Sequence, residues 1–262
     1  MTTLGSEASA EPAAASPQDA PMDVYLQPHS DDICFSLGAL AHKRQAGRLL
    51  TVFPVAGYVE RPGAPREVAA VTRLRAAEDA AFAAACGLTQ RRLEFPSASV
   101  LGHHPFDLAW VGENARRCET VLIAALTESA GERRDEGRPW LFAPGGIGGH
   151  VDHVAVRMVI ARNLDRLGQS YRIGFYEDLH YASDARTRTE GLRRLFDDLQ
   201  DRALIRHAWP LGAGGETKLA LIRLYASQFA ETPRSLARFS PAMRDEDPPH
   251  EALWSEEPAG PA

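Results

Sequence analysis

The residues most able to do chemistry in this chain are histidines and aspartates in two short clusters, PHSDD and GGHVDH. These residues are His29, Asp31 and Asp32 in the first cluster, and His150, Asp152 and His153 in the second. Two adjacent carboxylates beside an imidazole repel each other, and they lose solvation if they are partly buried. A bound dication would stabilise such a cluster by compensating its negative charge.

The residue types match one class of metal site. Two neutral imidazole nitrogens and one carboxylate, with a coordination position left open, form catalytic zinc and non-haem iron sites. His29, one of the two neighbouring aspartates and one later histidine supply this set. The second aspartate is then free to act as a base. The pattern therefore predicts a catalytic metal site, with Asp31 and Asp32 both open as the ligand.

The segments around the two clusters alternate between strand and helix patterns. Apolar runs predict strands at 23–27, 49–55, 91–95, 140–144 and 171–178, and helical spacing predicts helices at 31–46, 68–87, 113–129, 150–168, 185–199 and 216–228. This alternation predicts a single α/β domain, with a Rossmann-like, mostly parallel sheet flanked by helices. Because both clusters directly follow a predicted strand, we expect them at the same edge of the sheet, where ligands bind in such folds.

Composition and charge narrow the class of protein. The formal net charge of -6 disfavours nucleic acid as a partner. No apolar run approaches the roughly 18 residues of a membrane span. The first residues lack the features of a signal peptide, and the three cysteines are far apart, so we expect a cytoplasmic protein without disulfides. The predicted organisation is a disordered tail at 1–21, a folded domain at 22–243 and a C-terminal tail at 244–262.

The paired motifs resemble those of the LmbE-like, or PIG-L, deacetylase family, whose hallmarks read approximately (A/P)HPDDE and HPDH. Further matches are RAAED (75–79), FYEDL (175–179) and Lys218 with YASQ (225–228), so that the resemblance runs from about residue 23 to 230. It implies a zinc-dependent amidohydrolase that removes an N-acyl group, with acetyl as the leading expectation. The predominance of arginine over lysine and the abundance of alanine indicate a bacterial source with a GC-rich genome. The implied substrate is an amino-sugar-like small molecule or glycoconjugate, of the N-acetylglucosamine type.

The resemblance also implies a role for each residue of the site. It assigns one Zn2+ per chain, with His29, Asp32 and His153 as its ligands. It assigns Asp31 as general base, His150 as a preferably protonated acid that stabilises the transition state, and Asp152 as a carboxylate that orients a histidine. Arg75 matches an arginine that contacts the substrate.

The chain departs from the family pattern at several positions. Ile33 replaces the motif glutamate and Ser30 the motif proline. Without that glutamate the reciprocal contact of a capping box is missing, so we expect Ser30 to cap a less rigid helix start. Gly148 stands where some members carry a tyrosine, and residues 97–100 differ from the DAxxR often found in similar proteins. The exact substrate is therefore left open.

Two other functions compete with this interpretation. His29, Asp31 and His153 also spell the ligand pattern of a two-histidine, one-carboxylate Fe(II) oxygenase. That pattern normally occurs on all-β scaffolds, whereas here each motif opens a predicted helix. The missing glutamate suggests a non-catalytic sugar-binding relative, although every residue that the hydrolytic chemistry needs is present. A homo-oligomer is compatible with the sequence.

Overall fold

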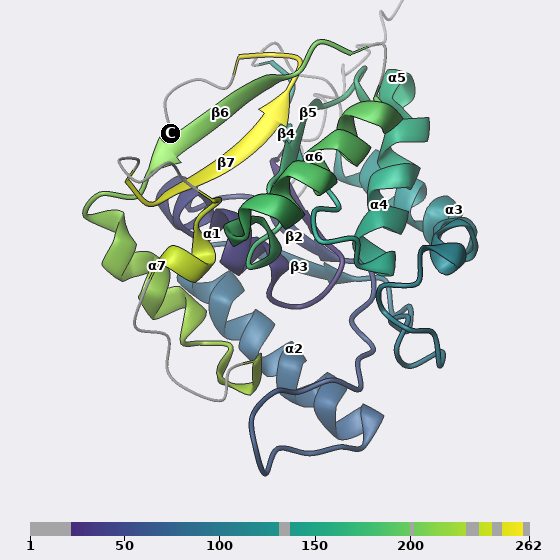
Figure 1. The fold of residues 1–262 in the computed structure, drawn as a ribbon, viewed down its shortest axis with the longest axis vertical. Coiled ribbons are helices and arrows are strands. Elements are labelled where there is room, and N and C mark those ends of the chain that lie inside the picture. Colours follow the sequence, from purple (N-terminus) through teal and green to yellow (C-terminus); the bar gives the residue numbers. More distant parts are fainter. Residues whose placement is uncertain (1–21, 131–136, 200–201, 229–235, 243–247, 259–262) are drawn as a thin grey trace, which may run out of the picture.

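The computed structural model describes residues 22–130, 137–199, 202–228, 236–242 and 248–258. The tail predicted at 1–21 lies outside the described residues. The strands are β1 (Val24–Gln27), β2 (Arg48–Thr51), β3 (Thr89–Arg92), β4 (Trp140–Pro144), β5 (Arg172–Tyr176), β6 (Ile205–Pro210) and β7 (His250–Ser255). They form one seven-stranded sheet in the order β3-β2-β1-β4-β5-β7-β6 (Figure 1). The predicted α/β fold with a mostly parallel sheet is confirmed.

The order of the strands reverses between β1 and β4: β2 and β3 follow on one side of β1, and β5 follows on the other side of β4. The strands from β3 to β5 are parallel neighbours, and β7 and β6 add two antiparallel strands at one end. Because the strand order runs outward in both directions from β1 and β4, a crevice opens beyond the carboxyl ends of these two strands. The PHSDD cluster follows β1 and the GGHVDH cluster follows β4. The two clusters therefore meet at this crevice.

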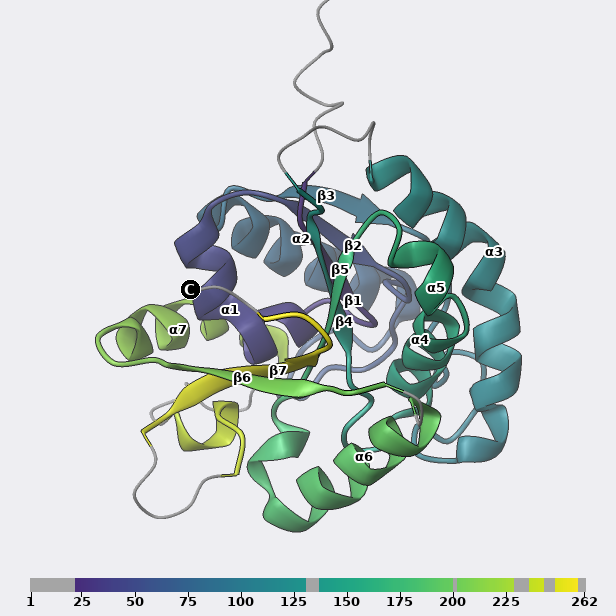
Figure 2. The ribbon, with the colours of Figure 1, turned by 90° about the horizontal axis from the view of Figure 1, so that it is seen from above.

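Helices cover both faces of the sheet. They are α1 (Asp32–Arg44), α2 (Val68–Ala85), α3 (Val111–Ser129), α4 (Val151–Arg162), α5 (Leu164–Leu167), α6 (Ala185–Asp198) and α7 (Gly214–Ile222), with short 3-10 turns η2 (Leu108–Trp110), η3 (Tyr181–Ser183), η4 (Ala226–Gln228) and η5 (Ala237–Phe239). Seen from above, α1, α2 and α7 lie on one side of the sheet, and α3, α4 and α5 lie on the other (Figure 2). No helix in the described ranges is long and apolar enough to cross a membrane.

The central strands are buried on both faces. Every residue of β1 and β4 is buried, which explains why their sequences VYLQ and WLFAP are nearly continuous apolar runs instead of alternating patterns. Tyr25 of β1 stacks on Phe142 of β4 with ring centroids 4.9 Å apart. The strands that carry the two polar clusters are therefore anchored in the hydrophobic core.

The predicted C-terminal tail is wrong for residues 250–255, which form β7 inside the sheet. β7 pairs antiparallel with β5 on one side and β6 on the other. Its sequence, HEALWS, has no long apolar run because its second residue is charged. This residue, Glu251, is nevertheless buried. Glu251 is neutralised by Lys218 at 2.9 Å, and this pairing permits a charged residue in a strand of the core.

Glu251 also supports the helix that begins at the first polar cluster. Helix α1 is kinked at Leu37, whose φ of -132° is not helical. Glu251 accepts hydrogen bonds from the backbone N–H groups of Ala39 and Leu40, each at 2.9 Å, in the helical segment beyond the kink. The carboxylate thus acts as an N-terminal cap for that segment. The last strand of the sheet is in this way bound to the helix that follows β1.

Candidate metal centre and catalytic pocket

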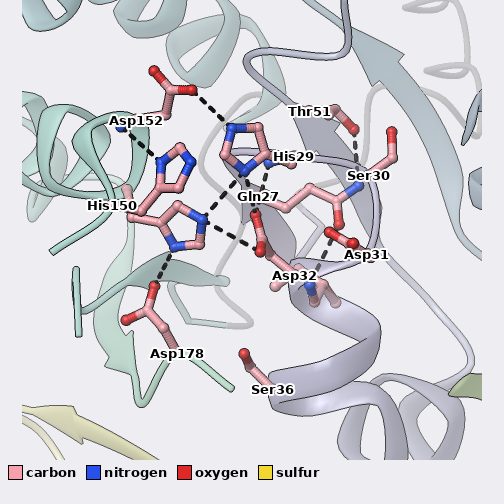
Figure 3. A network of polar contacts seen from close by, with 12 residues as sticks. Gln27, His29, Ser30, Asp31, Asp32, Ser36, Thr51, His150, Asp152 and Asp178 are labelled. Carbon is pink, nitrogen blue, oxygen red and sulfur yellow. Dashed lines mark hydrogen bonds and ion pairs between the residues drawn. The ribbon is translucent and has the colours of Figure 1, made fainter. Parts of the chain in front are cut away.

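The ring of His29 lies between Asp152 on one side and Asp32 on the other (Figure 3). His29 Nδ1 lies 3.3 Å from His153 Nε2. The other nitrogen of each ring contacts a carboxylate: His29 Nε2 lies 2.8 Å from Asp152, and His153 Nδ1 lies 2.8 Å from Asp178. These carboxylates favour tautomers that carry the proton on their side. The two facing nitrogens are then free to bind a cation between them.

Asp32 completes a triangle with these two nitrogens. Its carboxylate oxygens lie 3.6 Å from His29 Nδ1 and 3.4 Å from His153 Nε2. In a tetrahedral zinc site, bonds of about 2.0–2.2 Å place neighbouring ligand atoms about 3.4 Å apart. The separations of 3.3, 3.4 and 3.6 Å are of this size, and the two distances to Asp32 run to different oxygens, Oδ2 toward His29 and Oδ1 toward His153. The donor atoms present here fit a zinc ion.

The electrostatics of the centre also favour a positive charge. Burial alone would lower the pKa of His153, but the carboxylates of Asp32 and Asp178 raise it to about 9. The carboxylates that stabilise a proton on His153 would also stabilise a metal cation, which replaces that proton when it binds. His29, His150 and His153 can also bring three nitrogens within 4.8 Å of one another. Asp32, through its contacts of 3.6 and 3.4 Å with His29 and His153, offers a third ligand as an alternative to His150.

Asp152 is buried deep behind His29. It also accepts hydrogen bonds from the amide of Asn114 at 2.7 Å and from the backbone N–H of Ala98 at 3.0 Å. Although burial raises the pKa of this carboxyl, the hydrogen bond from His29 and its other partners hold the pKa below its ordinary value. Asp152 therefore stays ionised and orients His29, in the position that the sequence analysis gave it. Asn114, on α3, was not identified from the sequence.

Asp178 is the counterpart of Asp152 for the second histidine. It follows β5, accepts the backbone N–H of Ile147 at 2.9 Å and is fully buried beside His153. Sequence reasoning did not include it among the site residues, although FYEDL ends a predicted strand. Its neighbour Glu177 points elsewhere and pairs with Arg188 and Arg206.

Asp31 does not face the two histidines as Asp32 does. Its carboxylate pairs with Arg75 Nη2 at 2.9 Å, and the same nitrogen donates to the carbonyl of Ser30 at 2.6 Å. The φ of Asp31 is +132°, a strained conformation for a residue with a side chain. Burial raises the pKa of Asp31 well above its ordinary value, and Arg75 opposes this rise. Arg75 thus holds the strained turn, and because it also lines the pocket, its contact with substrate stays a prediction.

His150 caps α4 and also faces the pocket. Its Nδ1 accepts the backbone N–H of Asp152 at 3.2 Å, so the neutral ring carries its proton on Nε2. Burial, and then the nearby His29 and His153, lower the pKa of His150 well below its ordinary value. This direction opposes the expected protonated ring. A neutral His150 can nevertheless donate one hydrogen bond through Nε2.

The start of α1 is held by contacts that were not predicted from the sequence. Ser30 does not cap the helix; its side chain bonds to the buried carboxylate of Asp79. Asp32 accepts the backbone N–H of His29 at 2.7 Å, and Gln27 accepts that of Ile33 at 3.3 Å. Asp79 in turn holds the Gln27 amide at 3.0 Å. This buried network supplies the support that the missing glutamate would provide.

A tyrosine does lie beside Gly148, but it comes from a later segment. Gly148 has a φ of +95°, and a Cβ on it would stand 2.4 Å from Cγ of Tyr181. The Tyr181 ring meets His153 edge-on, with centroids 5.9 Å apart. Only a glycine leaves room for this ring at the edge of the site. The histidines and aspartates of both clusters, except buried Asp152, line one pocket of about 340 Å³ together with Tyr181.

Comparison with known proteins shows similarity to deacetylases in part of the sequence and in the fold. No protein-family model matches the chain. It is 32% identical over 165 residues to a 2'-N-acetylparomamine deacetylase of Streptomyces fradiae; this alignment covers 61% of the chain and 57% of the relative, little more than half of its length.

Two solved structures share the fold at lower identity. The A40926 pseudoaglycone deacetylase is 18% identical, with a TM-score of 0.61 and coverage of 90% of this chain and 97% of the other. The N,N'-diacetylchitobiose deacetylase of Pyrococcus horikoshii is 15% identical, with a TM-score of 0.51 and coverage of 81% and 72%. The protein thus has a fold found in deacetylases, and part of its sequence is similar to a deacetylase.

Proposed function

We propose that the protein is a metal-dependent N-deacetylase that hydrolyses the linear amide of an N-acylated amino sugar or glycoconjugate. The observation that carries this proposal is the triangle of His29 Nδ1, His153 Nε2 and the Asp32 carboxylate, with Asp31 lining the same pocket. The similarity to deacetylases that are named for amino-sugar and glycopeptide substrates supports the substrate class.

In this proposal His29, Asp32 and His153 hold one zinc ion. When bound, zinc would polarise the amide carbonyl and acidify a water molecule. Asp152 and Asp178 fix the two histidine rings, so that the ligand nitrogens need not reorganise. The separations between the ligand atoms are close to those of a zinc site. Ions that prefer oxygen ligands do not favour a site with two imidazoles.

The remaining steps belong to side chains of the pocket. Asp31 accepts a proton from the attacking water, and Arg75 keeps the carboxylate turned toward the pocket. His150 donates a hydrogen bond from Nε2 to the oxyanion that develops on the amide carbonyl. The C–N bond then breaks, the proton passes to the leaving nitrogen, and the products are a carboxylate and an amine.

The test combines metal analysis with product detection. We expect about one zinc per chain, and release of acetate together with a primary amine from N-acetylated amino sugars under anaerobic conditions. His153→Ala should lose both zinc and activity, because one of three ligands is missing. His42→Ala is the matched control, since His42 lies at the far end of α1 and does not line the pocket.

Full zinc occupancy in His153→Ala would refute the ligand assignment. Product formation that needs dioxygen would instead favour the Fe(II) oxygenase.

A further inference from the structure

The rim of the pocket carries two exposed aromatic side chains. Seven large hydrophobic side chains are exposed in the described part of the chain, and two of them, Tyr58 and Phe106, line the pocket. Tyr58 is 59% exposed and Phe106 is 47% exposed. Val68 and Leu108, also exposed, lie close by on the same two segments. Exposed aromatic side chains that gather at a concave site indicate a binding surface.

Phe106 is held in place by two aromatic rings inside the pocket. Phe106 meets His150 edge-on with ring centroids 5.6 Å apart, and it meets Tyr181 edge-on at 6.1 Å. Tyr181 is itself fixed against Gly148. Phe106 thus rests on the residue proposed to contact the oxyanion, and about half of its surface remains open to solvent. A substituent next to the reacting amide would reach this open face.

The charges that line the pocket do not suit a cationic substrate. Among its described lining residues only Asp31 and Asp32 carry carboxylates. Asp31 is paired with Arg75, and Asp32 contacts the two histidines and the backbone N–H of His29. No carboxylate of the lining is therefore left to bind a further ammonium group. A polyamine entering this pocket would lose solvation without gaining a counter-charge.

We propose that the substrate is an uncharged N-acyl amino sugar that carries an aromatic or other apolar substituent, and that Tyr58 and Phe106 bind this substituent. The proposal rests on the proposed deacetylase function and adds the substrate class to it. The two rings offer flat apolar faces, on which an aryl or acyl group buries area that a bare sugar does not have. An amino sugar with additional free amines is the class that this pocket disfavours.

The experiment compares four glycosides of N-acetylglucosamine: methyl, propyl, 2-aminoethyl and phenyl. The propyl and 2-aminoethyl glycosides are matched in size and differ in charge. We expect the phenyl glycoside to exceed the methyl glycoside in kcat/KM by about ten-fold, the scale of burying one aromatic face. We expect the propyl glycoside to exceed the 2-aminoethyl glycoside. Equal values within both pairs, or a preference for the ammonium, would overturn the proposal.

Variants then locate the preference. Tyr58→Ala and Phe106→Ala should each reduce the phenyl-to-methyl ratio of kcat/KM by about three-fold or more. Tyr58→Phe, which keeps the ring, should retain the ratio. Phe196→Ala is the matched control, since Phe196 is an exposed phenylalanine on α6 that does not line the pocket. A ratio unchanged in both alanine variants would overturn the assignment to these two residues.

Binding separates this proposal from the proposed function. Saturation-transfer NMR reports whether the phenyl glycoside binds more tightly than the methyl glycoside, whether or not either is hydrolysed. Tighter phenyl binding without release of acetate would refute the deacetylase and leave the aromatic rim supported. Hydrolysis of all four glycosides at equal rates, with equal binding, would refute the rim and leave the deacetylase supported.

Discussion

Asp31 and Asp32 are neighbours in the sequence, yet their carboxylates face different groups. Asp32 contacts both histidines of the triangle, whereas Asp31 pairs with Arg75. We therefore expect Asp32→Asn to lose zinc. Asp31→Asn should retain zinc and lose activity by about 10²- to 10⁴-fold, the usual contribution of a general base. Zinc content and turnover of the two purified variants test this pair; loss of zinc only in Asp31→Asn would reverse the roles.

His150 allows its two roles to be separated. His150→Ala should lower kcat by about 10²- to 10³-fold, with zinc retained and KM little changed, because it removes one donor to the oxyanion. His150→Asn keeps a side-chain acceptor for the N–H of Asp152 and should restore the stability of α4 without restoring kcat. Steady-state kinetics and urea unfolding measure the two effects. An unchanged kcat in both variants would reduce His150 to a helix cap.

The six residues of the two clusters were predictable from the sequence because histidines and aspartates at strand ends are chemically conspicuous. The residue types alone left the roles of Asp31 and Asp32 open, and only the family resemblance assigned them, since their different contacts depend on a backbone φ of +132° and on Arg75 from a distant helix. The sequence left Glu177 and Asp178 undistinguished at the end of a predicted strand, and only their contacts separate them, since Asp178 faces His153 and Glu177 pairs with Arg188.

At the scale of elements, the loop before α4 depends on Gly148. We expect Gly148→Ala to destabilise the protein by about 2–4 kcal/mol, because it combines a strained φ with a collision against Tyr181. Gly63→Ala is the control: its φ is +76°, but nothing lies within 4 Å of the added Cβ, so only about 1 kcal/mol of strain is expected.

The free energy of unfolding in urea measures both substitutions. If the collision is the cause, Gly148→Ala combined with Tyr181→Ala should be less destabilised than the sum of the single variants. Strict additivity, or equal losses at the two glycines, would contradict this explanation.

Among the strands, β1 and β4 were predicted best. Strands that are buried on both faces appear in the sequence as short, continuous apolar runs. β6 and β7 were missed for the opposite reason. β6 reads IRHAWP, with charged and exposed residues, and β7 contains the buried ion pair of Glu251 with Lys218. Helix α4 also ends earlier than predicted, at Arg162, because Asn163 leaves the helical conformation.

At the scale of the whole molecule, the buried cysteines predict how stability changes with pH. Burial raises the pKa of Cys86 and of Cys118 to about 12, above the value near 8.5 of an unfolded thiol. Since the folded pKa is the higher one, this stability is fully present below about pH 8.5 and is lost as the pH rises toward 12. We expect a loss of about 2 kcal/mol per thiol between pH 8.5 and 10.

Urea unfolding in the presence of a reductant measures this slope. The variant with both Cys86→Ala and Cys118→Ala should be less stable at pH 8 because it loses packing, yet it should lose less stability between pH 8.5 and 10. A slope equal to that of the parent protein would contradict the prediction.

The place of β7 also determines the order in which the molecule can be completed. β7 is the last strand along the described chain, but it lies between β5 and β6, and its residue Ala252 accepts the N–H of Glu177 next to Asp178. A growing chain therefore produces His29, Asp32 and His153 long before β5 has its second neighbour. Interrupted synthesis at any point before residue 250 leaves an open strand edge beside this candidate site, which is the kind of edge that pairs with other chains.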